Sequence, residues 1–568
     1  MTTRAEPATA LDATAADPVL QRRCVLIVHG VGEQRKSDTL LYIGSPLVNW
    51  VMRWARLFYN RPAASVGRVE LSFVPFDVGA GDTPPFAVLD LPDQRWYFAE
   101  AWWAGSSFHP DFGTMLYWSF VHLFDILAQM LRNTAERAWY LIHPRDPDTS
   151  SQPARFWQLV DLINCVVLGT GYAVGVVVGY ALLIPLMLVA QVPIEALQKF
   201  VLVKLLQPIM TADAGEFRIF IDDELQAANI RRRVADAAQA LMQHAECDEL
   251  IIVAHSEGCV VSLGMLTDPI FVDVARRTRK LLTFGAGLNK TWLIKPTLDR
   301  LFAPLTGDTL WTDFWASYDP VPAGPLDPTR RKLANGAACQ MTDVYQPSGD
   351  ALAQVGPGQP PINEQVTNGM NVMTDHGGYF TNEEQVVIRL AAEISAERHT
   401  DSAFWPANDV LREGIRARRQ RVSALALWRD VIFLAWALTS LGPWLLGWLA
   451  SVNPWGPLSA VSPSSLGPAG VVVEALKFLQ TGLPDLLAPI SGIAGVLLGL
   501  PALLGIAVLV GVVAWAIYSL VDWQWWQRWD AAARGAFLQA SVESSQAQRR
   551  AVQAGPDGVT VQGSSRTA

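Results

Sequence analysis

Short apolar runs alternate with stretches of helical spacing along much of the chain. The run RCVLIVHGVG ends in glycines and predicts a buried strand followed by a tight turn. Further strands are predicted at RVELSFVPFD, DELIIVAHSEG, KLLTFGAG, TLWTDFWASYDPV and ACQMTDVYQP. Residues 222–246 and 382–398 have the spacing of amphipathic helices. Strands that alternate with helices predict a mostly parallel, buried sheet, and therefore an α/β fold.

Three longer apolar segments interrupt or follow this pattern. Residues 162–194 and 486–521 contain no charged side chain, and residues 425–452 form a further apolar run. At a rise of about 1.5 Å per residue, each charge-free segment is longer than a hydrocarbon core of about 30 Å. These lengths favour membrane-associated helices over buried core helices.

The composition agrees with a chain that is partly soluble and partly membrane-bound. Hydrophobic residues make up 51% of the 568 positions, charged residues only 17%, and the mean hydropathy is +0.20. The net charge of −9, without a long basic stripe, argues against nucleic-acid binding. The five cysteines are scattered without paired spacing, which favours a reducing compartment and gives no metal site.

The stretch LIIVAHSEGCVV places a serine at a predicted turn between a strand and a helix. Ala254-His255-Ser256-Glu257-Gly258 follows the elbow pattern G-x-S-x-G, with alanine in place of the first glycine. A serine hydroxyl needs a base to take its proton and donors to stabilise the oxyanion. The alternative is that Ser256 is a small residue after a strand, but the strand before it and the helix after it favour a nucleophile.

The base and the orienting acid are expected downstream of the serine. His376 lies in the glycine-rich MTDHGGYF, and Asp319 follows a predicted strand in WASYDPVP. The order Ser256, Asp319, His376 is the order of an α/β-hydrolase triad. Less suited candidates are His399 at a helix end, Asp313 within a strand, and Asp375 beside the base.

Two backbone N–H groups are expected to form the oxyanion hole. The glycines of LIVHGVGEQ let the chain turn so that the Val31 N–H points inward together with the Glu257 N–H. The residues expected to shape these two motifs, rather than to react, are His29, Gly30, Gly32, His255 and Gly258.

A phosphate-binding loop is a rival interpretation of the first turn. GVGEQRKS nearly matches G-x-x-x-x-G-K-[ST], but Arg35 occupies the position of the second glycine. GAGLNKT fails in a similar way. A loop that cradles phosphate with its amides needs small residues, so nucleotide hydrolysis is disfavoured.

These blocks resemble lipase-like α/β-hydrolases, a family that includes membrane-associated bacterial members. The likeness is carried by VLIVHGVGEQ, IIVAHSEGCV, FGAGL, YDPV and VTNGMNVMTDHGGYFTN, and covers roughly residues 23–76 and 217–398. It implies an α/β-hydrolase fold and a serine hydrolase of esters or thioesters, often of lipids. It assigns Ser256 as nucleophile, His376 as base and Asp319 as orienting acid, and it implies no metal or cofactor.

The expected organisation is an α/β-hydrolase domain interrupted by a membrane-associated helical insertion and followed by transmembrane helices. The expected parts are a disordered leader at 1–22, a catalytic domain at 23–76 and 213–400, a helical cap and membrane insertion at 77–212, a C-terminal transmembrane region at 423–530, and a disordered tail at 540–568.

The insertion has to enter and leave one side of the bilayer, because strands of one sheet flank it. A two-pass hairpin with PIEALQKFVLVKLLQP and a segment that stays in one leaflet are both possible. The aromatic-rich RWYFAEAWWAGSSFHPDFGTMLYWSF fits either a bilayer interface or packing within a cap.

Basic residues predict the orientation. LREGIRARRQRVSALALWRD precedes the 425–452 run, and arginines follow the 486–521 run beside WQWWQRW. The positive-inside rule places both flanks in the cytoplasm. We therefore expect an integral protein of the bacterial inner membrane, with its catalytic domain facing the cytoplasm.

The sequence thus predicts a membrane serine hydrolase that cleaves acyl esters of lipids or lipid-like molecules through an acyl-enzyme. Its expected partners are the lipid bilayer and an acylated substrate, with no nucleic acid. Two alternatives stay open: a thioesterase or deacylase of lipidated proteins, and an inactive membrane scaffold on the same fold.

Overall fold

The computed structural model describes residues 21–30, 35–60, 68–72, 86–103, 220–294, 309–322, 324–326, 361–371, 374–440 and 529–554. It also describes residue 305, short stretches between 122 and 169, and residues 513, 516 and 520.

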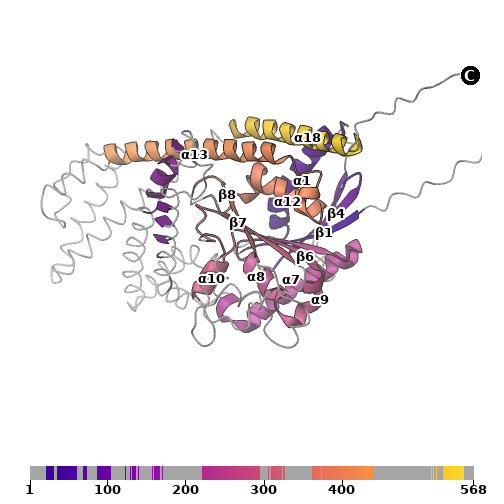
Figure 1. The fold of residues 1–568 in the computed structure, drawn as a ribbon. Coiled ribbons are helices and arrows are strands. Elements are labelled where there is room, and N and C mark those ends of the chain that lie inside the picture. Colours follow the sequence, from indigo (N-terminus) through magenta and orange to yellow (C-terminus); the bar gives the residue numbers. More distant parts are fainter. Residues whose placement is uncertain are drawn as a thin grey trace, which may run out of the picture.

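Within these residues, eight strands form one mostly parallel sheet in the order β2-β3-β4-β1-β5-β6-β7-β8 (Figure 1). Only the pairs β2·β3 and β3·β4 are antiparallel. The strands are β1 (Gln21–Val28), β2 (Arg68–Ser72), β3 (Phe86–Asp90), β4 (Gln94–Ala101), β5 (Leu250–His255), β6 (Thr278–Phe284), β7 (Leu310–Ala316) and β8 (Ile362–Val366).

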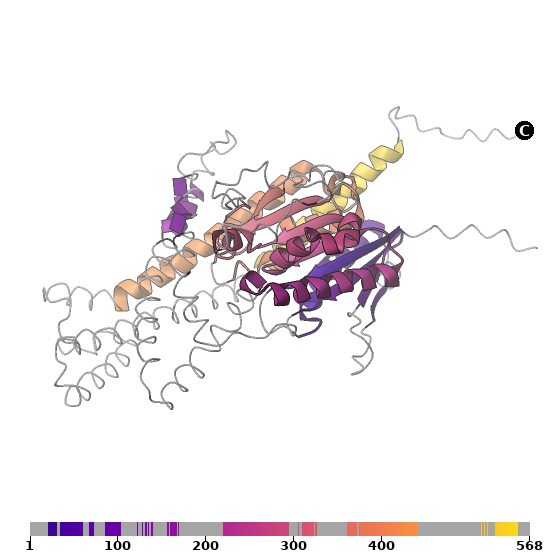
Figure 2. The ribbon, with the colours of Figure 1, turned by 90° about the horizontal axis from the view of Figure 1, so that it is seen from below.

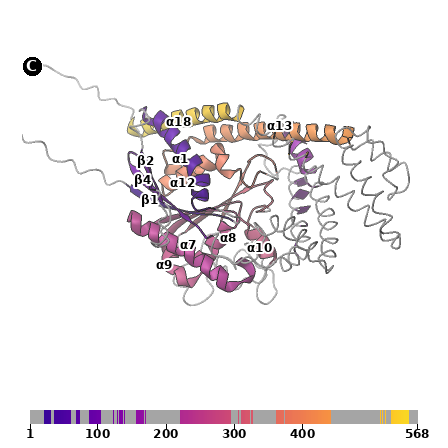
Figure 3. The ribbon, with the colours of Figure 1, turned by 180° about the vertical axis from the view of Figure 1, so that it is seen from behind.

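Helices cover both faces of the sheet (Figures 1 and 3). On one face lie α7 (Glu224–Ala245), α8 (Gly258–Leu266), α9 (Val272–Arg277) and α10 (Leu288–Ile294). On the other lie α1 (Asp38–Tyr59), α12 (Ile388–Ser395), α13 (Asn408–Ser440) and α18 (Ala531–Ala554). Helix α13 extends well beyond the sheet at one end (Figure 2).

The central strands supply residues to two cores, one under each layer of helices. Along β5, Ile252 and Ala254 face the core beneath α7 and α8, whereas Ile251 and Val253 face the core beneath α1 and α12. Because side chains alternate along a strand and both faces are covered, the strand has to be apolar throughout. This confirms the buried, mostly parallel sheet expected from the apolar runs.

The strands β1, β2, β5, β6 and β7 lie where the apolar runs predicted them. The strand β8, in the polar sequence INEQV, was not predicted, and the segment ACQMTDVYQP lies outside the described residues. The helices α7 and α12 match the two amphipathic segments, with a π-helical turn, Glu383–Val387, before α12.

One domain boundary is wrong. The range 77–212 was expected to form a helical cap, yet it contains β3 and β4, and β4 pairs with β1 along its whole length. The reason is burial: Trp96 and Phe98 fill one core while Tyr97 and Ala99 fill the other. The first aromatics of this region are therefore sheet residues, not cap or interface residues.

The expected disordered tail at 540–568 is also wrong as far as Ala554. Helix α18 packs on α1, α13 and the turn before α12, and buries Phe537, Leu538 and Val542. Gln546 Nε2 donates to the carbonyl oxygen of Phe58 at 2.8 Å. The helix buries a narrow apolar stripe, so its mean composition is polar although it is ordered. Residues 1–20 and 555–568 lie outside the described part.

Cys24 on β1 and Cys247 before β5 form a disulfide with a Cα–Cα distance of 6.4 Å. The scattered cysteines had favoured a reducing compartment, in which disulfides are rare. The two residues are 223 positions apart, so their spacing gave no indication of the pairing. Cys165 and Cys259 are buried.

The membrane segments fall mostly outside the described residues. This is so for 486–521 and for most of 162–194, while 425–452 is described as far as Ser440, as the end of α13. Among the helices that the structure describes, none by itself has the length and hydropathy to span a bilayer. Taken together, the two bent helical segments Gly258–Leu266 and Pro269–Arg277 have the length and hydropathy of a membrane span, but every residue of α8 is buried in the core.

Candidate active site

Ser256 lies at a sharp turn between β5 and α8. Its φ of 59° is in the left-handed region, which a serine adopts only when its surroundings impose it. The Ser256 N–H donates to the Phe284 carbonyl oxygen of β6 at 2.9 Å, and the Ser256 carbonyl accepts from the Cys259 N–H at 3.2 Å. The strained turn is therefore fixed from both the sheet and the helix.

Two glycines let the loop after β1 approach this turn. A Cβ on Gly30 would lie 2.9 Å from Ser256 Oγ, and a Cβ on Gly258 would overlap the carbonyl oxygens of Val28 and His29. Both positions thus require glycine for steric reasons. Gly30 and Gly258 hold the end of β1 and the elbow in direct contact, as expected of residues that shape these motifs.

His376 and Asp319 form a hydrogen-bonded pair. His376 Nδ1 lies 3.0 Å from Asp319 Oδ1 and 2.9 Å from Oδ2. In the neutral tautomer whose Nδ1–H donates to Asp319, Nε2 is the acceptor that a general base needs. The Asp319 side chain is fully buried, whereas that of His376 is 24% exposed, so the imidazole forms the accessible end of the pair.

Asp319 is held by two further donors. Oδ1 accepts from the Val321 N–H at 2.8 Å, and Oδ2 accepts from the Tyr379 hydroxyl at 2.8 Å. The same hydroxyl accepts from the Ala316 N–H at the end of β7 at 2.9 Å. These donors fix the orientation of the Asp319 carboxylate. The sequence gave no indication of this role for Tyr379.

The elbow and the His376–Asp319 pair meet at the carboxyl edge of β5, β6 and β7. The ring of His255, next to Ser256, stacks on the His376 ring at 4.6 Å, and His255 Nε2 donates to the His376 carbonyl oxygen at 2.9 Å. Gly285 directly follows β6 and has a φ of 60°. A Cβ there would lie 2.8 Å from Asp319 Oδ2 and 3.0 Å from His376 Nδ1. Three distant parts of the chain are thus gathered at one place.

The two other histidines of the motifs are buried and have structural contacts. Burial lowers the pKa of His29 to about 4 and that of His255 to about 3; the charge of nearby His376 adds to the effect on His255. His29 Nδ1 donates to the Gly30 carbonyl oxygen at 2.6 Å, and its Nε2 accepts from the Trp103 N–H at 3.0 Å. Both rings are neutral near pH 7 and hold backbone groups in place.

The other acids considered for the triad have different partners. Asp375 Oδ1 accepts from the backbone N–H of Gly369 at 2.6 Å and of Asn371 at 3.2 Å. Asp313 accepts from the Thr283 hydroxyl at 2.6 Å inside the sheet. Burial raises the pKa of each to about 7. Of the three acids, Asp319 is the one that contacts His376.

Of the two residues predicted to form the oxyanion hole, only Glu257 belongs to the part of the chain that the structure describes. Val31 and Gly32 lie outside the described residues. Glu257 follows Ser256 directly, is buried, and begins the first turn of α8, where backbone N–H groups point away from the helix and favour negative charge.

Helix α1 contributes a residue that the sequence analysis missed. The Tyr42 hydroxyl donates to the carbonyl oxygen of Gly377 at 2.6 Å, and its ring lies 5.8 Å from that of His255. Burial raises the pKa of Tyr42, so its hydroxyl stays protonated as a donor. Tyr42 thus ties the glycines after His376 to α1.

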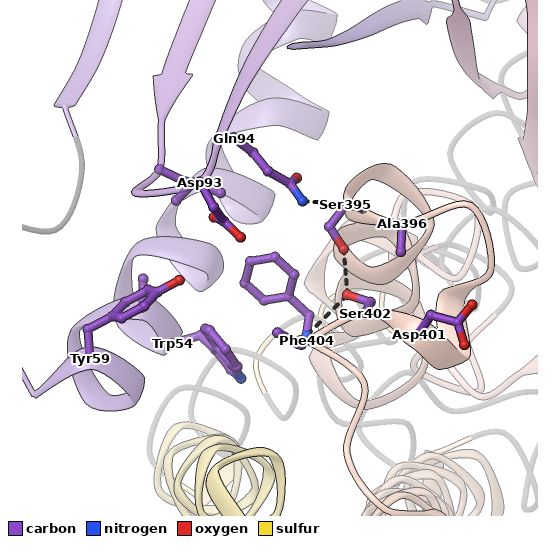
Figure 4. A pocket seen from close by; sticks show the side chains of 12 residues that line it. Trp54, Tyr59, Asp93, Gln94, Ser395, Ala396, Asp401, Ser402 and Phe404 are labelled. Atoms are coloured by element: carbon purple, nitrogen blue, oxygen red, sulfur yellow. Dashed lines mark hydrogen bonds between the residues drawn. The ribbon is translucent and has the colours of Figure 1, made fainter. Parts of the chain in front are cut away.

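A separate cavity of about 180 Å³ lies at the amino edge of the sheet, between the start of β4 and the end of α12 (Figure 4). Trp54 and Phe404 line it, and Gln94 Nε2 donates to the Ser395 carbonyl oxygen at 2.8 Å beside it. Since the elbow is at the opposite edge, this cavity is not part of the candidate active site.

Comparisons of the chain with protein families, curated proteins and solved structures found no match.

Proposed function

We propose that the chain is a serine hydrolase with an α/β-hydrolase fold, which cleaves acyl esters of lipids or lipid-like molecules. The observation that carries the proposal is the pair of His376 and Asp319 beside a strained Ser256 elbow. Its support is chemical: a nucleophile, a base and an orienting acid are the groups that acyl transfer needs, and they occur here in the order typical of the fold.

In the proposed reaction, Ser256 Oγ attacks the carbonyl carbon of the ester while His376 Nε2 takes the hydroxyl proton. The tetrahedral oxyanion accepts hydrogen bonds from the Glu257 N–H and from the Val31 N–H. His376 then returns its proton to the leaving alcohol as the C–O bond breaks, which leaves an acyl-Ser256. Water, deprotonated by His376, releases the carboxylic acid and restores the serine. Asp319 stabilises the imidazolium in both halves.

Exposed apolar side chains support a lipid as substrate and a bilayer as partner. In the second half of α13, the side chains of Trp428, Val431, Ile432 and Leu434 are each at least 40% exposed. Large apolar groups clustered on one helix favour contact with another apolar surface. Together with the charge-free segments of the sequence, they favour an integral membrane protein.

The orientation is a further part of the proposal. The basic residues around the apolar segments favour a cytoplasmic catalytic domain, whereas the Cys24–Cys247 disulfide is more typical of an oxidising compartment. We propose the cytoplasmic side. A reporter protein fused after residue 568 tests this, because α18 packs on the catalytic domain; activity of a reporter that works only outside the cytoplasm would reverse the orientation.

A fluorophosphonate probe tests the enzyme. We expect full-length protein in native membranes to be labelled, and Ser256→Ala to lose all labelling. Failure of the wild-type protein to label would favour the inactive scaffold. Comparison of the lipids in membranes with active and Ser256→Ala protein then tests the substrate class: a changed ester lipid supports the proposal, and unchanged lipids with labelled protein favour deacylation of proteins.

A further inference from the structure

The segment 367–371 leads into the loop that carries His376. It contains Met370 at φ 50°, a left-handed conformation that is strained for this residue. Asn371 accepts from the Asp375 N–H at 2.8 Å, so the left-handed turn and the residue before His376 are one hydrogen-bonded unit. A strained backbone persists only where its surroundings impose it.

Two buried arginines of α13 bind the carbonyl groups of this segment. Arg418 Nε donates to the Thr367 carbonyl oxygen at 2.8 Å, and its Nη2 donates to that of Asn368 at 3.2 Å. Arg429 Nη2 donates to Gly369 at 2.7 Å and to Met370 at 3.1 Å. Four consecutive carbonyls thus accept hydrogen bonds from one helix.

The same helix packs beside the acid of the candidate triad. Val422 and Ala426 of α13 form a small apolar cluster with Met370 and Tyr318, and Tyr318 immediately precedes Asp319. The Ser423 hydroxyl lies 3.5 Å from the sulfur of Met370. Helix α13 therefore contacts the segment before the base and the residue before the acid.

Arg418 is itself anchored to the core. Its Nη1 donates to Glu384 Oε2 at 3.0 Å, and both side chains are almost fully buried. Arg421 donates to the other oxygen of Glu384 at 2.7 Å. A planar guanidinium can serve a carboxylate and two carbonyls at once, which a lysine ammonium cannot do with the same geometry.

We propose that Arg418 and Arg429 are positioning residues of the active site: they hold the left-handed turn at Met370 and, through it, His376. This rests on the proposed function, because it names how the proposed base is held in place. The consequence is that α13, whose second half carries exposed apolar side chains, sets the geometry of the base without touching the substrate.

The test compares Arg429→Gln with Arg429→Lys and with Arg412→Gln, a matched change at an exposed arginine of the same helix. Full-length protein in phospholipid nanodiscs is treated with a fluorophosphonate probe. We expect Arg429→Gln to lower the labelling rate by about tenfold to a hundredfold, as small displacements of catalytic groups do. Arg429→Lys should recover part of the rate, and Arg412→Gln should keep the wild-type rate.

Hydrogen exchange separates this role from a general loss of structure. In Arg429→Gln we expect faster exchange in peptides over 366–378, with unchanged exchange over 250–266. Faster exchange in both regions, or unchanged exchange over 366–378, would overturn the proposal. If the wild-type protein does not react with the probe, the proposed function fails, and the exchange of these two regions alone decides whether α13 holds the turn.

Discussion

Charged side chains are buried at both the amino and the carboxyl edge of the sheet, where the parallel strands begin and end, but their hydrogen-bond partners differ. At the amino edge, Lys280 Nζ donates to Glu393 Oε2 at 2.6 Å and to the carbonyl oxygens of Glu393 and Ala396 at 2.7 Å. At the carboxyl edge, Asp319 accepts from the Val321 N–H and the Tyr379 hydroxyl and contacts His376 Nδ1, and the proposed reaction uses the other nitrogen of His376. A buried charge whose hydrogen bonds are all made within the protein stabilises the fold, whereas the proposed reaction needs a group with a nitrogen left for the substrate.

Electrostatics sharpen this contrast. Burial alone would raise the pKa of Glu393, but the hydrogen bond from His399 and the charges of Lys280 and Arg389 lower it to about 2. At the other edge, burial raises the pKa of Asp375 to about 7 and lowers that of His255 to about 3. The surroundings of Glu393 thus favour its charged form, although burial lowers the pKa of its partner Lys280. The surroundings of the site favour the neutral forms of Asp375 and His255.

The largest expected effect is on catalysis at the carboxyl edge. His376→Ala and Asp319→Asn should each reduce ester turnover by about four orders of magnitude, because the first removes the base and the second leaves the imidazole in the wrong tautomer. Hydrolysis of a short soluble ester, with thermal unfolding as the control for folding, measures this. Full activity in Asp319→Asn would transfer the orienting role to another acid.

The next effect belongs to the amino edge and should appear in stability alone. Lys280→Met leaves the buried Glu393 without its closest cation, so we expect a loss of about 3–5 kcal/mol in the free energy of unfolding. The exposed pair of Arg279 and Glu249 is the matched control, and Arg279→Gln should cost no more than about 1 kcal/mol. If Lys280→Met also lowered turnover per folded molecule, the expectation that the amino edge affects stability alone would be contradicted.

A smaller change at Gly285 should affect turnover more than stability. In Gly285→Ala the new methyl group meets Asp319 and His376, and the left-handed φ adds strain, so the pair has to shift. We expect turnover to fall by about a hundredfold. Gly535→Ala is the control, since a Cβ at Gly535 has no neighbour within 4 Å among the residues that the structure describes. Equal effects of the two substitutions would contradict the placement of Gly285 at the site.

The smallest effect concerns pH. Asp313 has an ordinary pKa of 3.8, which burial raises to about 7 in the fold. Such an acid contributes stability that is complete below about pH 4 and is lost as the pH rises to about 7. Asp313→Asn should therefore make the melting temperature decline less steeply between pH 4 and 7. The decline should not vanish, because Asp375 contributes to it in the same way. An unchanged decline would show that Asp313 is ionised in the fold.

Local sequence was sufficient for the elbow, because a strand, a turn and a helix around Ser256 are contiguous. The chain order was sufficient to select His376 and Asp319 as the partners that the structure brings together. Tyr379 and Gly285 were beyond this reasoning. The importance of Tyr379 comes from a hydrogen bond across 60 positions, and that of Gly285 from the lack of space for a side chain.

The wrong sequence predictions have one physical origin. Local composition indicates structure poorly where a segment is only partly buried, or where it is buried by residues far away in the sequence. The aromatic stretch around Trp96 was assigned to the cap because its neighbour β1 is far away in sequence. Helix α18 was taken as disorder because it buries only one stripe. Arg418 and Arg429 belong to a run of basic residues whose pattern does not distinguish a buried arginine from an exposed one.

Helices α13 and α18 return to the same body from opposite ends of residues 441–528. The Ala407 N–H donates to the Ser544 hydroxyl at 2.8 Å, and Gly414 lies against Phe537. A protease that cuts once between the two helices would therefore nick the molecule without separating its fragments, and the carboxyl-terminal piece should co-purify with the rest under non-denaturing conditions.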